Sequence, residues 1–150
     1  MAFLSANSWI CERALREADG VVSAIRIVDV FMTSVRPEVP VEQQVVPMTL
    51  LAVIRLSPDD DGNHTVETVL VRPDGERATQ QIFAGPVSIG RFPELSRTIW
   101  AMVHMGVVPR QFGTHRVVVR FDNEEVTTSE FTLLEAPLDQ QTANVLVMQP

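Results

Sequence analysis

The residues best suited to chemistry in this 150-residue chain are carboxylates gathered in two turn-like segments. Three aspartates are consecutive in SPDDDGNHT, residues 57–65, and a second acidic group follows in DNEE, residues 122–125. Calcium prefers oxygen ligands of this kind, but an EF-hand spaces its aspartates at alternate positions, so the first segment fails as a linear motif. The same residue types also suit a solvated turn, because Asp, Asn and Gly tolerate left-handed backbone.

Whether the two acidic segments lie close together depends on the number of strands between them. If every strand crosses the domain once, successive connections alternate between its ends, and 57–63 then falls at the same end as 122–125. The turn PDGE, residues 73–76, falls at the other end. We therefore predict, as an alternative to two solvated turns, a calcium site built from loop carboxylates. Its candidate ligands are Asp59, Asp60, Asp61, Asp122, Glu124 and Glu125.

Three histidines are the other candidates for acid–base or ligand chemistry. His64 borders the first acidic segment, His104 lies in an expected strand, and His115 opens the last hairpin. No His-x-His pair or His-Glu-x-x-His motif is present, so their spacing supports no linear metal site. We expect His104 to be a partly buried structural residue and His115 to hydrogen-bond backbone near Gly113. An enzyme site that joins His104 or His115 to a distant carboxylate is the alternative.

Other nucleophiles and bases are scarce. Cys11 is the single cysteine, and its acidic neighbour Glu12 would raise the pKa of its thiol, so we expect a buried structural residue. There is no Gly-x-Ser-x-Gly motif and no glycine-rich phosphate loop. The sequence contains neither lysine nor tyrosine, which removes Schiff-base chemistry and one common acid–base group. We expect no catalytic residue and no cofactor, calcium excepted.

The net charge of −7 argues against nucleic acid and anionic membranes as partners, since both are bound by basic surfaces. No apolar run approaches the roughly 20 residues that span a bilayer. The N-terminal residues lack the basic and apolar regions of a signal peptide. One cysteine cannot form an internal disulfide, which suits a reducing compartment. We therefore expect a cytoplasmic protein.

Short apolar segments separated by Pro, Gly and Asp predict an all-β protein. Between the first two expected strands, ERALREADG at 12–20 predicts a short helix or a turn that ends at Gly20. The run at 21–34 is apolar on both faces, which predicts one central strand. The proline-rich segment 36–47 is expected to be an extended connection. The strands are expected at 2–11, 21–34, 48–56, 64–72, 77–85, 97–108, 113–121 and 126–134.

About seven to nine strands at this spacing predict a single antiparallel β-sandwich of immunoglobulin-like character. We expect the sandwich to cover 1–135 and a separate tail to cover 136–150. The tail carries a short apolar stretch within 144–148, which could add to a sheet edge of its own chain or of another subunit. The large side chains useful at an interface are expected mainly in the core. They are Trp9, Phe92, Trp100, Met102 and Met105.

Two stretches carry a family pattern. WICERALREADGVVSAIRIVDVF, residues 9–31, is a strand ending in Cys-Glu, then a charged segment, a glycine and a long apolar strand. PRQFGTHRVVVRFDNEEV, residues 109–126, is a Phe-Gly lead-in, a strand, an Asp-Asn turn and a return strand. Together they resemble a family of uncharacterised bacterial β-sandwich proteins, a domain of unknown function, over residues 2–134. The resemblance implies the sandwich fold and no activity, and His115 stands where that family tends to carry an aromatic residue.

The leading functional hypothesis is a non-enzymatic protein-interaction or structural module, bacterial or phage-derived, with a protein partner or a second copy of itself. A calcium-dependent binding sandwich and a histidine–carboxylate enzyme are the two alternatives.

Overall fold

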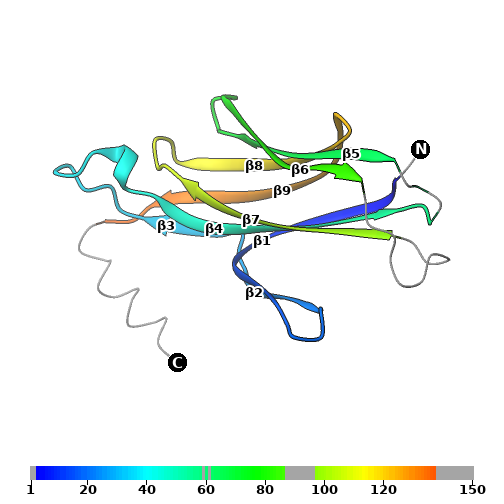
Figure 1. Ribbon diagram of the computed structural model, residues 1–150. Coiled ribbons are helices and arrows are strands. Elements are labelled where there is room, and N and C mark those ends of the chain that lie inside the picture. Colours follow the sequence, from blue (N-terminus) through cyan, green and yellow to red (C-terminus); the bar gives the residue numbers. More distant parts are fainter. Residues whose placement is uncertain (1–2, 59, 61, 87–96, 138–150) are drawn as a thin grey trace.

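The described part of the protein consists of two β-sheets packed face to face (Figure 1). The computed structural model describes residues 3–58, 60, 62–86 and 97–137. Its strands are β1 (Phe3–Arg16), β2 (Val22–Ile27), β3 (Val30–Thr33), β4 (Val46–Leu56), β5 (Asn63–Val71), β6 (Arg77–Pro86), β7 (Arg97–Val107), β8 (Gly113–Phe121) and β9 (Glu124–Glu135), with a 3-10 turn at Val41–Gln43.

One sheet has the strand order β2-β1-β4-β7 and the other β3-β9-β8-β5-β6. Neighbouring strands are antiparallel except for the parallel pair β3–β9. The prediction of an all-β immunoglobulin-like sandwich with seven to nine strands is confirmed.

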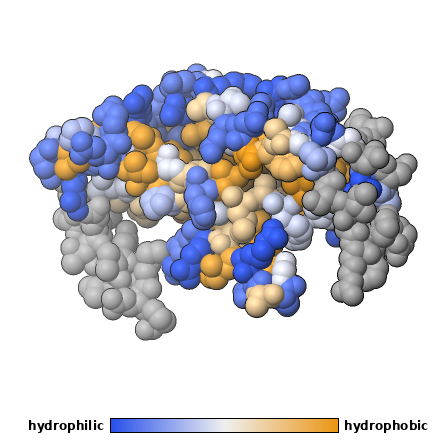
Figure 2. All heavy atoms as spheres, in the orientation of Figure 1, coloured by the Kyte–Doolittle hydropathy of each residue, from blue (hydrophilic) through white to orange (hydrophobic). Residues whose placement is uncertain are grey.

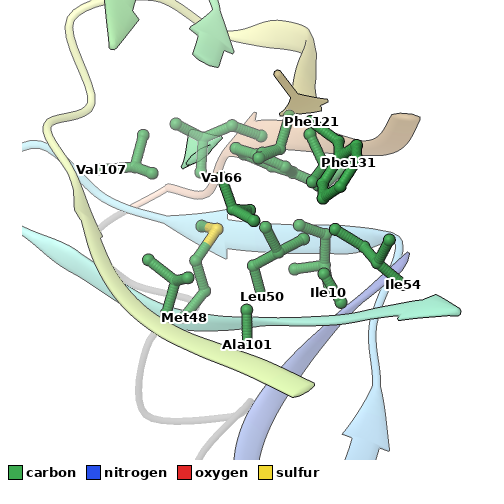
Figure 3. Close-up of a cluster of buried hydrophobic side chains, with 14 of the residues drawn as sticks. Ile10, Met48, Leu50, Ile54, Val66, Ala101, Val107, Phe121 and Phe131 are labelled. Atoms are coloured by element: carbon green, nitrogen blue, oxygen red, sulfur yellow. The ribbon is translucent and has the colours of Figure 1, made fainter. Parts of the chain in front are cut away.

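A single main core fills the space between the sheets (Figure 3). Alternate residues of a strand point to opposite faces, so every second side chain of the central strands enters this core. Phe131 of β9, a member of this core, is 1% exposed. Ser8 of β1 also reaches across, where its hydroxyl is 2.6 Å from that of Ser129 in β9. The labelled core residues are Ile10, Met48, Leu50, Ile54, Val66, Ala101, Val107, Phe121 and Phe131.

The charged segment 12–20 forms no helix. β1 continues through it to Arg16, and a turn follows in which the Glu17 amide donates to the Val21 carbonyl at 2.7 Å. Gly20 has φ of +88°, a backbone conformation that glycine adopts without steric cost. The turn was therefore the correct one of the two predicted options, and the helix was wrong.

The apolar run at 21–34 is not one central strand, which corrects the prediction. It supplies β2 to one sheet and β3 to the other, and both are edge strands. At the crossing, the Val28 amide donates to Ile10 of β1 at 2.9 Å, and the Asp29 carbonyl accepts from Thr132 of β9 at 2.7 Å. The apolar residues of this run are not buried on both faces, since Ile27, Val30 and Met32 are 65%, 44% and 51% exposed.

The two acidic segments lie at the same end of the sandwich, as the strand count predicts. β5 begins where its antiparallel neighbour β8 ends, and the Thr65 amide donates to Asp122 Oδ1 at 2.9 Å. The turn at 73–76 lies at the other end, where Gln111 Nε2 donates to the Asp74 carboxylate at 2.5 Å.

Hydrophilic residues cover the upper side of the molecule in Figure 2, where β5, β6 and β8 lie. Hydrophobic residues appear below them, along the seam between the two sheets.

At the end of the described chain, β9 stops at Glu135 and the next residue is anchored to β3. The Ala136 amide donates to the Thr33 carbonyl at 2.9 Å, and its own carbonyl accepts from the buried Ser34 hydroxyl at 2.6 Å. The predicted tail strand within 144–148 lies outside the described residues, and the division into 1–135 and 136–150 stays a prediction. None of the helical structure that is described is long and apolar enough to span a bilayer.

Candidate functional site

At the acidic end, a histidine lies between two carboxylates. His64 Nε2 is 2.7 Å from Asp60 Oδ1, and its Nδ1 is 2.7 Å from Asp122 Oδ2. The imidazole ring also packs against Phe121, with ring centroids 4.7 Å apart. The His64 side chain is only 7% exposed. We call Asp60, His64 and Asp122 the histidine clamp, because it joins the connection before β5 to the turn after β8.

The clamp requires a positively charged histidine. A neutral imidazole donates from only one nitrogen, whereas here both nitrogens face carboxylate oxygens. Burial alone would lower the pKa of His64, but the hydrogen bonds to Asp122 and Asp60 outweigh it and raise the pKa above 6.5. The hydrogen bond from His64 is in turn the main reason that the pKa of Asp60 is lowered. The three side chains therefore form a charged, mutually stabilised group.

Arg97 at the start of β7 extends the clamp to the other sheet. It is 9% exposed, and its Nη1 donates to the backbone carbonyl of Asp60. Its charge lowers the pKa of Asp60 further. The clamp therefore ties the acidic end together and is poorly suited to catalysis, because neither His64 nitrogen is free to take a proton from a substrate.

The carboxylates predicted to bind calcium are only partly brought together. Asp60 and Asp122 contact opposite nitrogens of the clamp histidine, and Glu124 begins β9 as an exposed residue. Within the described part of the chain, no three His, Cys, Asp or Glu side chains are placed to hold a metal ion. Asp59 and Asp61 lie outside the described residues. The calcium site built from the whole set therefore stays a prediction.

The sequence contains a signal for the clamp, although it matches no linear metal motif. Asp60 and His64 are four residues apart on either side of a turn, and the strand count already placed Asp122 at the same end. A histidine among carboxylates at one end of a sandwich predicts an ion pair as readily as a metal site.

His115 is a fully buried structural residue. Its Nδ1 donates to the Gly113 carbonyl at 3.1 Å, which confirms the predicted backbone contact. The ring stacks on Phe131 with centroids 4.9 Å apart and 12° between the planes. Its Nε2 has no partner among the described residues. Burial lowers the pKa of His115, so the folded protein holds this ring neutral.

Replacing His115 with phenylalanine is expected to make the protein less sensitive to acid. Below pH 6.5, the ordinary value for histidine, the unfolded chain binds a proton at this residue that the folded chain resists. Wild-type stability should therefore fall relative to His115→Phe by up to about 1.4 kcal/mol per pH unit, down to the lowered folded-state pKa. Urea unfolding between pH 7.5 and pH 5 measures the difference. Parallel stability curves for the two proteins would contradict it, and His104→Phe is the control.

His104 is exposed on the edge strand β7, which corrects the prediction of partial burial. Its Nδ1 is 3.2 Å from the Thr49 hydroxyl. It borders a hollow of about 270 Å³ between β5, β6 and β7, and no carboxylate is among the described residues that line it. Neither His104 nor His115 thus has the carboxylate partner that the enzyme alternative requires within the described chain. Cys11 is fully buried as predicted, and burial raises the pKa of its thiol.

The outer face of the four-stranded sheet carries a second feature, an exposed aromatic surface. Trp9 on β1 is 38% exposed and Trp100 on β7 is 43% exposed. The register aligns side chains across β1, β4 and β7 in rows, so the two tryptophans lie two strands apart, about 10 Å across the sheet. The outward rows are Ser5–Arg55–Thr98, Asn7–Val53–Trp100, Trp9–Leu51–Met102 and Cys11–Thr49–His104.

Between the tryptophans, Leu51 and Val53 of β4 are nearly covered, at 4% and 9% exposure. A shallow hollow of about 340 Å³ opens beside them, with Arg55 exposed on its lining. We call this surface the tryptophan face; it comprises Asn7, Trp9, Leu51, Val53, Arg55, Trp100 and Met102.

The position of both tryptophans corrects the expectation that they belong to the core. Met102 shares their outward face, whereas Met105 is partly buried against the core as expected. Phe92 lies outside the described residues. The residues that follow the tryptophans in the sequence, Ile10 and Ala101, are smaller and belong to the core.

Two face-to-face sheets with this strand arrangement define the class of protein as an immunoglobulin-like β-sandwich. Within that class, the chain belongs to DUF6941, a family of unknown function, whose model matches residues 7–134. The resemblance to a family of unknown function, inferred over residues 2–134, is thereby confirmed, and the bacterial origin stays a prediction. No curated protein matches the sequence.

Comparison with solved structures found similarities at low sequence identity. The alkylpurine DNA glycosylase AlkC of Pseudomonas fluorescens, bound to DNA containing an abasic site analog, is 12% identical with a TM-score of 0.50. The match covers 85% of this chain but only 30% of the glycosylase. An immunoglobulin-like protein of Pseudomonas aeruginosa is 12% identical with a TM-score of 0.42, over 86% of this chain and 94% of that one. A β-glucosidase of Listeria innocua is 11% identical with a TM-score of 0.43, over 86% of this chain and 16% of that one.

Proposed function

We propose that this protein is a non-enzymatic interaction module that binds a protein partner through the tryptophan face. The observation that carries the proposal is the exposure of both tryptophans of the chain on one face of the same sheet. Tryptophan is among the residues that contribute most to protein interfaces, and exposed aromatic surface of this kind marks binding sites.

The chemistry of the face favours an apolar partner segment that carries a carboxylate. Arg55 is the one charged member of the face, in a protein whose net charge is −7. No described carboxylate forms an ion pair with Arg55. A partner carboxylate would give it a charge-assisted hydrogen bond, while apolar side chains cover Trp9 and Trp100.

The titratable side chains support a binding role over a catalytic one. Both nitrogens of His64 are held by carboxylates, and His115 is buried and neutral. The thiol of Cys11 is fully buried and its pKa is raised, which makes it a weak nucleophile.

The proposal places the module in a bacterial cytoplasm, with no nucleic-acid or membrane partner. The single buried thiol suits a reducing compartment. The acidic net charge opposes binding to polyanions.

Replacing both tryptophans with serine is expected to abolish partner binding while the fold is retained. Each truncation should remove about 2 kcal/mol, or roughly 30-fold in Kd, as expected for hot-spot residues. The partner is first captured in cells by a photo-crosslinking residue introduced at Asn7, with Arg116 on the other sheet as the control position. The purified partner is then titrated against wild type, Trp9→Ser, Trp100→Ser and the double variant.

The intrinsic fluorescence of the protein reports directly on this face, because its two tryptophans both lie there and it contains no tyrosine. A blue shift on addition of the partner is expected. The control variant Val21→Ser removes an apolar residue that is 57% exposed in the β1–β2 turn, and it should bind normally. A partner that binds the double serine variant as tightly as wild type would overturn the proposal, as would a monomeric protein from which position 7 captures nothing.

A further inference from the structure

We propose that the apolar stretch at 144–148 of the tail pairs with the free edge of β3 in its own chain, as an antiparallel tenth strand. The proposal concerns a different surface from the tryptophan face and does not depend on it.

The first observation is the open edge of β3. Among the described residues, β3 pairs only with β9. The carbonyls of Asp29 and Thr33 both accept hydrogen bonds from the β9 side. Alternate residues of a strand direct their backbone groups to the same side, so the amides and carbonyls of Val30 and Met32 point to the opposite, open side.

The second observation is that β3 lacks the features that normally discourage edge pairing. Natural edge strands carry charges, prolines or bulges that oppose the addition of another strand. Two of the other three edge strands carry an exposed arginine within their bounds, Arg26 in β2 and Arg77 in β6. β3, with the sequence VFMT, contains no charge and no proline.

The third observation is exposed apolar surface around this edge. Val30 is 44% exposed, Met32 is 51% exposed, and Leu134 opposite Met32 in β9 is 42% exposed. On the other face of β3, Phe31 is only partly buried against the core. A strand added here would therefore need apolar side chains on both of its faces.

The tail has that composition. Val145, Leu146, Val147 and Met148 are consecutive, so both alternating faces are apolar, and the run has the same length as the four-residue strand β3. β-branched valine favours this conformation.

The geometry of the chain favours pairing within one molecule. Ala136 is fixed at the Thr33 end of β3, so a tail that turns back runs antiparallel to it. The new strand lies two strand spacings from β9, about 10 Å. The seven residues 137–143 can span about 23 Å when extended, which is more than enough. A connection of this length also gives a local concentration of about millimolar, well above ordinary protein concentrations.

Amide hydrogen exchange measured residue by residue tests the proposal in the 150-residue chain. The amides of Val30 and Met32 are expected to exchange at least tenfold more slowly in wild type than in Val147→Pro, because proline cannot sustain the added strand. The Phe31 amide, on the β9 side, should be unchanged between the two proteins. Thr142→Pro places the same substitution in the connection and should leave Val30 and Met32 protected.

Repeating the measurement over a wide range of protein concentration separates the possible occupants of this edge. Concentration-independent protection that disappears in Val147→Pro supports pairing within the chain. Protection that grows with concentration, together with a dimer in light scattering, assigns the edge to the tail of a second copy and overturns the proposal. Equally fast exchange of Val30 and Met32 in wild type and Val147→Pro also overturns it.

Discussion

Replacing His64 with alanine is expected to lower the free energy of unfolding by about 2–4 kcal/mol at pH 6, since hydrogen bonds to charged groups contribute about 1.5–3 kcal/mol each and Asp122 is partly exposed. The variant loses both hydrogen bonds and the ring contact with Phe121. It also leaves the carboxylates of Asp60 and Asp122 without the cation between them, so that they repel each other.

The effect of His64→Ala should depend on pH in a defined direction. The pKa of His64 is raised in the folded state, so its stabilisation is fully present below pH 6.5 and is lost as pH rises through the folded-state pKa. The pKa of Asp60 is lowered, so its contribution is present above pH 3.8 and is lost as pH falls through its folded-state pKa. The difference between wild type and His64→Ala is therefore expected to be largest between these two values.

Urea unfolding of wild type and His64→Ala at pH 5, 6 and 9 measures this dependence. His104→Ala removes an exposed histidine and should change stability by less than about 0.5 kcal/mol, as surface substitutions usually do. An equal loss at pH 6 and pH 9 would show that His64 stabilises the protein only by packing on Phe121.

Replacing Phe131 with alanine is expected to cost about 3–5 kcal/mol, the range for truncating a buried aromatic residue. Phe131 is 1% exposed and connects two parts of the five-stranded sheet. It stacks on His115 of β8 and makes an edge-on contact with Phe31 of β3, at 5.8 Å between ring centroids. A cavity here would loosen the packing of β3, which pairs in parallel with β9, as well as removing buried area.

Denaturant unfolding of Phe131→Ala gives the size of the effect, and two variants serve as controls. Phe131→Leu keeps most of the volume and should cost less than about 1.5 kcal/mol. Leu134→Ala, three residues further along β9, removes a side chain that is 42% exposed and should have a small effect. A loss below 1 kcal/mol for Phe131→Ala would contradict the burial of Phe131 in the core.

The histidine clamp and the tryptophan face meet at the start of β7. Arg97 donates to the Asp60 carbonyl, and the next residue, Thr98, lies opposite Arg55. The contact of Arg97 with the clamp therefore anchors the start of β7, where Thr98 lies beside Arg55, the charged residue of the tryptophan face. An anchored strand end suits a binding surface, since ordering a mobile surface on binding would weaken affinity.

Alternation and turn chemistry in the sequence were enough to determine the fold class. The hairpin of β8 and β9 follows from alternating residues around the Asp-Asn turn, and β4, β5 and β6 lie within two residues of their predicted bounds. The strand count also placed Asp60 and Asp122 at one end, because antiparallel connections must alternate. These features depend on local periodicity and on counting, and both can be read along the chain.

Tertiary structure decided which of two apolar faces is the interior. Trp9 and Trp100 alternate with core residues, but Leu51 and Val53 beside them are apolar as well, so the pattern could not show that the tryptophans point outward. The run at 21–34 was ambiguous in the same way. One central strand buried on both faces and two short strands in different sheets can have the same apolar sequence pattern. The clamp likewise depends on Asp122 coming within 2.7 Å of His64, 58 residues away, and no local propensity encodes such a contact.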